Sequence, residues 1–142
     1  MPVYRNILVA IDCSPVDEAV IAAVSSMALQ LGATVHLLHV VHSHTIDQDR
    51  ILRAEALATL DRYRQQMQSA GISACAVLRS GEPDREILNE LENNSYDLLA
   101  MATHGHNLFG RILFGSVSRK LRQKIALPLL LIKPKEADHQ KR

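Results

Sequence analysis

The sequence predicts an α/β domain in which five parallel strands form one doubly wound sheet with helices on both faces. Strand-length apolar runs alternate with helical patterns along the whole chain, which is typical of a parallel sheet. The run Ile7–Ile11 is apolar throughout, as expected for a strand buried on both faces. The 142 residues, 47% hydrophobic and 22% charged, suit one domain with its own core. Right-handed crossovers with one reversal of winding leave two strand orders open, 3-2-1-4-5 and 2-1-3-4-5.

The first strand is expected over residues 3–11, followed by a helix that ends at Leu31. Ser14 is a suitable N-cap, Pro15 suits the first helical position, and Asp17 stands three residues after Ser14 as in a capping box. Gly32 then stops the helix.

The remaining elements continue the alternation, and turn-forming or capping residues separate them. They are expected as a strand over Thr34–Val41, a helix over about Gln48–Ala70 ended by Gly71, a strand over Ser73–Leu78, a helix from Pro83 to about Asn93, a strand over Asp97–Ala102, a helix from near Ser116 to Ala126, and a strand over Pro128–Lys133. We expect one domain over residues 1–134 and a polar tail over residues 135–142.

Composition excludes several classes of protein. A net charge of +1 and an aromatic content of 4% without Trp disfavour nucleic-acid binding. Cys13 and Cys75 lie far apart and form neither a disulfide framework nor a zinc motif. The chain shows neither a signal-peptide pattern nor an apolar run long enough to cross a membrane. We therefore expect a cytoplasmic protein without membrane insertion.

The loop after the fourth strand carries the strongest chemical signal. It reads Ala102-Thr103-His104-Gly105, then nine residues, then Gly115-Ser116-Val117-Ser118 at the start of a helix. Small residues let backbone amides approach an anion, and the first helical turn offers unpaired N–H groups with a partial positive charge. The pattern therefore predicts phosphate binding, although Gly115 could simply turn the chain and Ser116 cap the helix. It is not a Walker loop, because no Gly-Lys-Ser/Thr follows.

Two other strand-end loops narrow the function. The loop Asp12–Asp17 has two carboxylates and no Gly, so it would repel phosphate. Asp12 could instead accept hydrogen bonds from an adenine amine or ribose hydroxyls, or remain a solvated residue that helps to cap the helix. The loop Arg79-Ser80-Gly81 lacks the acceptor Asp that a phospho-receiver domain needs.

These residues together resemble the universal stress protein family. Its nucleotide-binding members carry Gly-x2-Gly-x9-Gly-Ser/Thr after the fourth strand, and this chain reads Ala102-x2-Gly105-x9-Gly115-Ser116. The resemblance covers about residues 3–133. Its weaker marks, in matching order, are Ile7–Asp12, Leu37–Val40, Gly81-Glu82-Pro83, Tyr96–Leu99 and Leu127–Ile132.

The resemblance implies a Rossmann-like sheet of the adenine-nucleotide α-hydrolase type with strand order 3-2-1-4-5. Its implied ligand is ATP, or ADP or AMP, and Mg²⁺ could accompany the phosphates. Asp12 and the Val40 backbone would flank the adenine, while Ala10, Met101 and Ala102 would lie along the ribose. The phosphates would be held by Gly105, Gly115, Ser116, Val117 and Ser118, and His104 would touch ribose or phosphate. Ala102 replaces the first Gly of the motif, which matters if that position needs a positive φ.

Several other side chains are expected to be structural. Alternation along a strand places His39 on the opposite face from His36 and His42, so a metal cluster cannot form there. His106 and Arg111 are expected to be exposed, although Arg111 could clamp a γ-phosphate. The basic residues Arg119–Lys124 suit a solvated helix end, and Cys13 is expected to be an idle thiol.

The resemblance favours a regulatory nucleotide-binding protein of the stress response that acts through an unknown protein partner. It also implies a homodimer paired through Leu127–Ile132, an apolar run that would be exposed as an edge strand. Two alternatives remain open: a slow ATPase or other nucleotide hydrolase, and a dimeric adaptor that no longer binds nucleotide. Hydrolysis needs a positioned base, for which only Asp12 and His104 qualify, so we expect it to be absent or slow.

Overall fold

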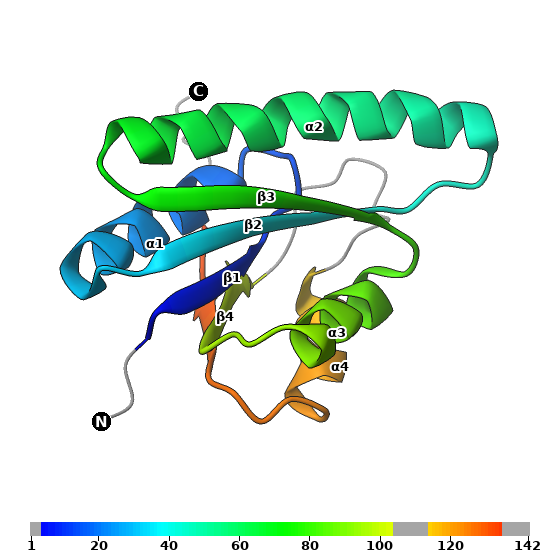
Figure 1. Ribbon diagram of the computed structural model, residues 1–142. Helices are drawn as coiled ribbons and strands as arrows, with labels where there is room; N and C mark the ends of the chain where they lie inside the picture. The colour runs from blue at the N-terminus through cyan, green and yellow to red at the C-terminus, as the bar shows by residue number, and fades with distance from the viewer. Residues whose placement is uncertain (1–3, 104–113, 135–142) are drawn as a thin grey trace, which may run out of the picture.

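The computed structural model describes residues 4–103 and 114–134, and strands and helices alternate along them (Figure 1). The strands are β1 Asn6–Ala10, β2 Thr34–Val41, β3 Ser73–Ser80, β4 Leu98–Ala102 and β5 Leu129–Ile132. The helices are α1 Asp17–Leu31, α2 Ile46–Ser69, α3 Pro83–Asn93 and α4 Phe114–Arg122. Within the described residues, no helix combines the length and the apolar character that a membrane crossing needs.

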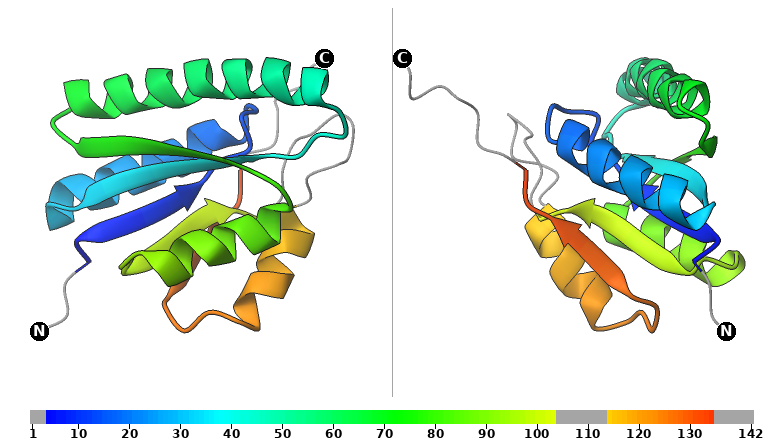
Figure 2. Two further views of the ribbon diagram at one scale, coloured as in Figure 1. Left: turned by 45° about the vertical axis from the view of Figure 1, so that its right-hand side comes forward. Right: turned by 90° about the vertical axis from the view of Figure 1, so that its left-hand side faces the viewer.

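All five strands pair in parallel, in the order β3-β2-β1-β4-β5. The expected fold class and the order 3-2-1-4-5 are therefore confirmed, and the order 2-1-3-4-5 is excluded. Helices α1 and α2 cover one face of the sheet, and α3 and α4 cover the other (Figures 1 and 2). The winding reverses between β1 and β4, so the two strands on either side of the switch point are hydrogen-bonded neighbours.

The core lies along the central strands, as their unbroken apolar runs predict. Ile7, Leu8 and Val9 of β1 are fully buried, as are Leu99 and Ala100 of β4. Burying each large side chain contributes roughly 1.5–3 kcal/mol relative to exposure. The edge strand β5 is different, because all four of its side chains are only partly buried.

The structure corrects several predicted boundaries, including the end of the last helix, which lies at Arg122 and not at Ala126. Helix α1 begins at Asp17, two residues later than expected, and Ser14 does not cap it, because Val16 holds the N-cap position. Helix α4 begins at Phe114, two residues earlier than expected, so Ser116 lies inside the helix and is not its cap. Helix α2 begins at Ile46, where the Thr45 side chain accepts the amide of Gln48. The predicted bounds of β2 are confirmed.

Candidate functional site

The candidate site lies at the carboxyl ends of β1 and β4, where the order of the strands reverses. Val9 pairs with Ala100, so Ala10 and Ala102 end neighbouring strands at the same edge of the sheet. The Asp12 loop leaves from β1, and the chain that follows β4 leads to α4. In open parallel α/β sheets, ligands bind at this position. The fold therefore places the end of β1, which leads to Asp12, next to the end of β4, which leads toward α4.

The Asp12 loop is held in one conformation by its own hydrogen bonds. The carboxylate of Asp17 accepts the amide of Asp12 at 2.7 Å and that of Ser14 at 3.2 Å. The Ser14 hydroxyl donates to Oδ2 of Asp12 at 2.7 Å. Between them Cys13 adopts φ 60°, a left-handed conformation that non-glycine residues rarely occupy. The bond from the Ser14 amide is the one that the capping-box spacing predicted for Asp17, and the bond from the Asp12 amide shows that Asp17 also orients the loop carrying Asp12.

Burial governs the titration of this loop. Desolvation raises the pKa of the Asp17 carboxyl to about 7, and the nearby charge of Asp12 adds to the increase. Burial also raises the pKa of the Cys13 thiol to about 12, and the charges of Asp17 and Asp12 contribute. A thiol with so high a pKa is a poor nucleophile at neutral pH, which agrees with the expectation of an idle cysteine.

A small cavity lies where the residues expected around the adenine meet. Its volume is about 10 Å³, and its walls are Ala10, Ile11, Leu38, His39, Val40, Pro83 and Ile87. That space holds about one water molecule, so the cavity as it stands is too small for an adenine ring. His39 supports its floor, because Nδ1 lies 2.9 Å from the Ile11 carbonyl. Ala10 and Val40 therefore line the same small cavity.

The residues expected at the phosphates lie in the first turns of α4. Gly115, Ser116 and Val117 are among its first four residues, whose amides find no partner within a helix. The side chains of Val117 and Ser118 are buried. Anions are stabilised at such a helix end by the amides and by the helix dipole. His104 and Gly105 lie outside the described residues, as do His106 and Arg111.

The question raised by Ala102 has a structural answer. Ala102 is the last residue of β4 and does not adopt a positive φ. A methyl group is compatible with this extended conformation, so the replacement of Gly strains nothing in the backbone. The side chain of Met101 is fully buried, so only its backbone could face a ribose.

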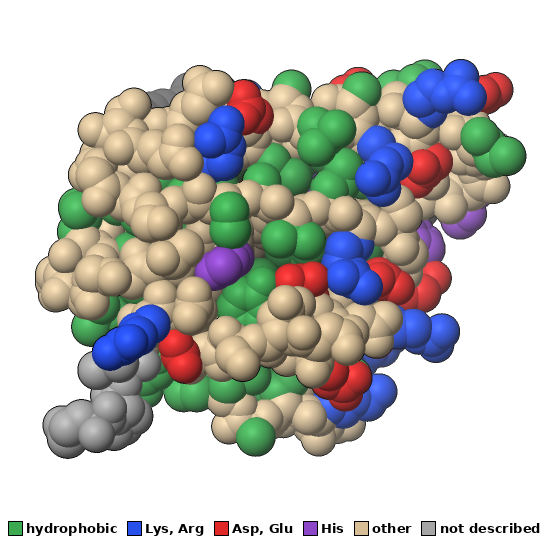
Figure 3. Space-filling view, in the orientation of Figure 1, with side chains coloured by type: hydrophobic (Ala, Val, Ile, Leu, Met, Phe, Trp, Pro, Cys, Tyr) green, Lys and Arg blue, Asp and Glu red, His purple; other side chains and the backbone are tan. Residues whose placement is uncertain are grey.

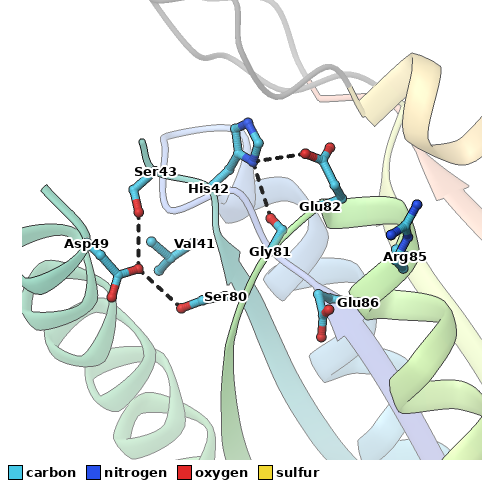
Figure 4. Close-up of a pocket in the computed structure, with 9 residues that line it drawn as sticks. All are labelled: Val41, His42, Ser43, Asp49, Ser80, Gly81, Glu82, Arg85 and Glu86. Atoms are coloured by element: carbon cyan, nitrogen blue, oxygen red, sulfur yellow. Dashed lines mark hydrogen bonds and ion pairs between the residues drawn. The ribbon is translucent and has the colours of Figure 1, made fainter. Parts of the chain in front are cut away.

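A larger pocket beside the candidate site was not predicted (Figure 4). Its volume is about 480 Å³, and it lies at the carboxyl ends of β2 and β3, near the starts of α2 and α3. His42 contacts the Glu82 carboxylate at 3.7 Å and the Gly81 carbonyl at 3.3 Å. Asp49 accepts hydrogen bonds from Ser43 and Ser80 across the pocket. In the sequence, the polar residues that follow β2 and β3 are the feature from which this pocket could have been predicted.

This pocket is unsuited to phosphate. Asp49, Glu82 and Glu86 bring three carboxylates to its walls, and among the described residues Arg85 is the one guanidinium that lines it. Polyphosphate would be repelled there and attracted to the first turn of α4.

The four histidines of the β2 region, His36, His39, His42 and His44, make separate contacts. His36 and His39 make separate contacts, with Asn6 and with the Ile11 carbonyl. The rings of His42 and His44 meet edge to face at 5.5 Å. Among residues 4–103 and 114–134, histidines, cysteines and carboxylates do not gather in groups of three or more that could hold a metal ion.

Comparison with known proteins agrees with the fold. The model of the universal stress protein family matches residues 3–133. The universal stress protein YxiE of Bacillus subtilis is 26% identical, over 92% of this chain and 99% of its own length. The solved structure of protein MJ0577 is 25% identical and superposes with a TM-score of 0.81, over 96% of this chain and all of that one. MJ0577 is itself a universal stress protein of Methanocaldococcus jannaschii.

A third relative was solved with a ligand. It is a universal stress protein from Archaeoglobus fulgidus in complex with dAMP, 25% identical with a TM-score of 0.71, over 93% of this chain and all of that one. The match of the family model extends over nearly the whole chain, and the fold and strand order agree with it. The chain belongs to the universal stress protein family.

Proposed function

We propose that this protein binds ATP, or ADP or AMP, as a regulatory homodimer of the stress response with absent or slow hydrolysis. The observation that carries the proposal is the pairing of β1 with β4, which brings the strand ends that lead to Asp12 and to Ala102 to one switch point, with α4 as the helix that follows β4. The dAMP complex of the Archaeoglobus fulgidus relative supports an adenine nucleotide.

The described residues suit the parts of a nucleotide in a definite order. The Val40 backbone and the Asp12 carboxylate would flank the adenine, with Asp12 as an acceptor for its amine or for ribose hydroxyls, and Ala10 would lie along the ribose. The amides of Gly115, Ser116 and Val117 would hold the phosphates, with the Ser118 hydroxyl beside them. Met101 and Ala102 would contact the ribose through backbone atoms. When bound, the nucleotide supplies phosphate charge that Mg²⁺ could accompany.

Calorimetric titration with ATP, ADP and AMP tests the proposal. Gly115→Val should abolish binding, because a branched side chain would stand among the amides that face the phosphates. Lys120→Val is the matched control, since it places the same side chain on an exposed part of α4 and should leave the affinity unchanged. Unchanged ATP affinity in Gly115→Val would refute the phosphate site.

The same titration separates the alternatives. A protein that binds none of the nucleotides at millimolar concentration would be a dimeric adaptor without nucleotide. Clear release of phosphate from ATP that Asp12→Ala abolishes would establish a hydrolase.

The homodimer is proposed to form through β5. This strand ends the sheet, and its four apolar side chains are partly exposed. The carbonyl of Pro128 accepts the amide of Leu99 in β4. The carbonyl of Ile132 accepts the amide of Thr103, which directly follows β4. Alternation then turns the backbone groups of Leu129 and Leu131 away from β4, free to pair with a second copy.

Light scattering after size exclusion tests this arrangement. The wild-type protein should have twice the 15.8 kDa mass of the chain. Leu131→Pro removes an outward N–H and should give a folded monomer, whereas Leu130→Pro removes an inward N–H and should destabilise the sheet itself. A wild-type monomer, or a dimer that survives Leu131→Pro, would contradict the proposed interface.

A further inference from the structure

Three polar side chains form a hydrogen-bonded relay across β3, β2 and β1, away from the candidate nucleotide site. Sγ of Cys75 lies 3.0 Å from Nδ1 of His36. Nε2 of the same ring lies 3.0 Å from Oδ1 of Asn6. Cys75 and His36 are register partners, and Asn6 begins β1, so the relay lies near the amino ends of the strands.

The direction of the relay follows from its chemistry. The carboxamide oxygen of Asn6 can only accept, so Nε2 of His36 carries the ring proton and donates it. Nδ1 of a neutral ring is then an acceptor, and the Cys75 thiol donates to it. The arrangement is that of an activated nucleophile: the imidazole can take the proton of the thiol, and the amide orients the ring.

The surroundings keep the pair neutral. Burial raises the pKa of the Cys75 thiol, and burial lowers the pKa of His36. The carboxylate of Glu90 on α3 is the charge that faces both groups, and it is held by Arg79 of β3, by Asn94 and by Tyr96. The pair therefore stays as S–H···N, and the thiol loses its proton only as the sulfur reacts.

The pair is also accessible. Cys75 and His36 are both partly exposed to solvent. The Tyr96 ring packs edge to face against the His36 ring at 5.0 Å. On the face seen in Figure 3, a histidine and hydrophobic side chains reach the surface between β3 and α3. A small molecule could approach the sulfur along this strip.

We propose that Cys75 is a site of covalent modification by small neutral electrophiles of the α,β-unsaturated carbonyl class, with His36 as its general base and Asn6 as a positioning residue. The sulfur bonds to the β-carbon while its proton passes to Nδ1 of His36. The electron pair of the carbon–carbon double bond moves to form an enolate. His36 then returns the proton to the α-carbon, so the product is a thioether and the imidazole is neutral again. The carboxylate of Glu90 disfavours anionic electrophiles at this position.

The experiment uses the full chain with Cys13→Ser, which leaves Cys75 as its single thiol. The probe is N-ethylmaleimide, and intact-mass spectrometry follows the rate of addition between pH 5.5 and 9. A base-assisted thiol should react at a nearly constant rate above the His36 pKa and more slowly below it. An unassisted thiol would instead gain about tenfold in rate per pH unit toward its own pKa. That second profile, measured with the relay intact, would overturn the proposal.

Variants identify the partners of the sulfur. His36→Gln should lower the rate at pH 7 at least tenfold, and His44→Gln, an exposed histidine outside the relay, should leave it unchanged. Asn6→Asp places a carboxylate beside Nε2 of His36, which favours the protonated ring, so the midpoint of the pH profile should move upward. A merely structural role of residue 6 would not move this midpoint. Thermal unfolding checks that each variant is folded, and the profile with the relay intact tests the proposal without any substitution at its three residues. A maleimide carrying a carboxylate should react several-fold more slowly, and an equal rate would contradict the preference for neutral electrophiles.

Discussion

Replacing Asp17 by asparagine tests how a buried carboxyl controls the loop that carries Asp12. The Asp17 side chain is 1% exposed and accepts the amides of Asp12 and Ser14. Desolvation nevertheless raises the pKa of this carboxyl from 3.8 to about 7, because the hydrogen bonds only partly offset the loss of water. The folded protein thus binds this proton more tightly than the unfolded chain does.

The sign of the effect on stability follows from linkage. The protonated carboxyl costs nothing below the unfolded pKa of 3.8, and stability falls as pH rises from there through the folded pKa of about 7. A shift of roughly 3 units corresponds to about 4 kcal/mol over the full range. Between pH 5 and pH 8 the loss of unfolding free energy due to this carboxyl is roughly 2.5 kcal/mol. The asparagine side chain does not titrate. The unfolding free energy of Asp17→Asn minus that of the wild type should therefore increase by this amount between pH 5 and pH 8.

Urea denaturation followed by circular dichroism at pH 5, 6, 7 and 8 measures the difference between the two proteins. The difference, and not the wild-type curve, carries the result, since other groups titrate in the same range. Glu18→Gln is the matched control, because Glu18 is exposed in the same helical turn, and its difference should stay within about 0.5 kcal/mol. A flat difference for Asp17→Asn, or one of opposite slope, would refute the claim that desolvation outweighs the amide hydrogen bonds.

Three further substitutions test individual features. Cys13 has φ 60°, so Cys13→Gly should unfold at a free energy about 1 kcal/mol higher than Cys13→Ala in urea, and equal stabilities would contradict the strain. Ala102→Gly should cost about 0.5–1 kcal/mol of stability and leave ATP affinity within about twofold in calorimetry, whereas a tenfold gain would mean that the methyl obstructs the ligand. Glu90→Ala removes the acceptor shared by Arg79 and Tyr96 and should lower the unfolding free energy by about 2–3 kcal/mol, and a loss below 0.5 kcal/mol would show that the network is dispensable.

The order of the strands illustrates what the sequence could and could not decide by itself. The apolar runs indicated five strands, but runs of this kind do not state which strand lies beside which. Local pattern left two orders open, and the family resemblance chose the one that the structure confirms. Strand neighbours are set by packing between distant segments, which no local window contains.

The candidate site shows the same division. Small residues before and within α4 were visible in the sequence, and so was the strand-end Asp12. Their meeting required β1 and β4 to be neighbours. The capping-box spacing correctly predicted that the Asp17 carboxylate accepts the amide of Ser14, whereas its second bond, to the amide of Asp12, was not visible in the sequence.

The sequence by itself determined the class of fold, because hydrophobic periodicity acts locally. It also predicts the extent of the domain and a phosphate-binding loop, because small residues that lead into a helix are visible in a local pattern. Only the tertiary structure decided that Ala102 lies in extended backbone, that Asp17 orients the Asp12 loop, and that Cys75, His36 and Asn6 form a relay. These features depend on backbone angles and on contacts between residues far apart in the chain, such as Cys75 and His36, which are 39 positions apart. Such contacts exist only after the strands have taken their places.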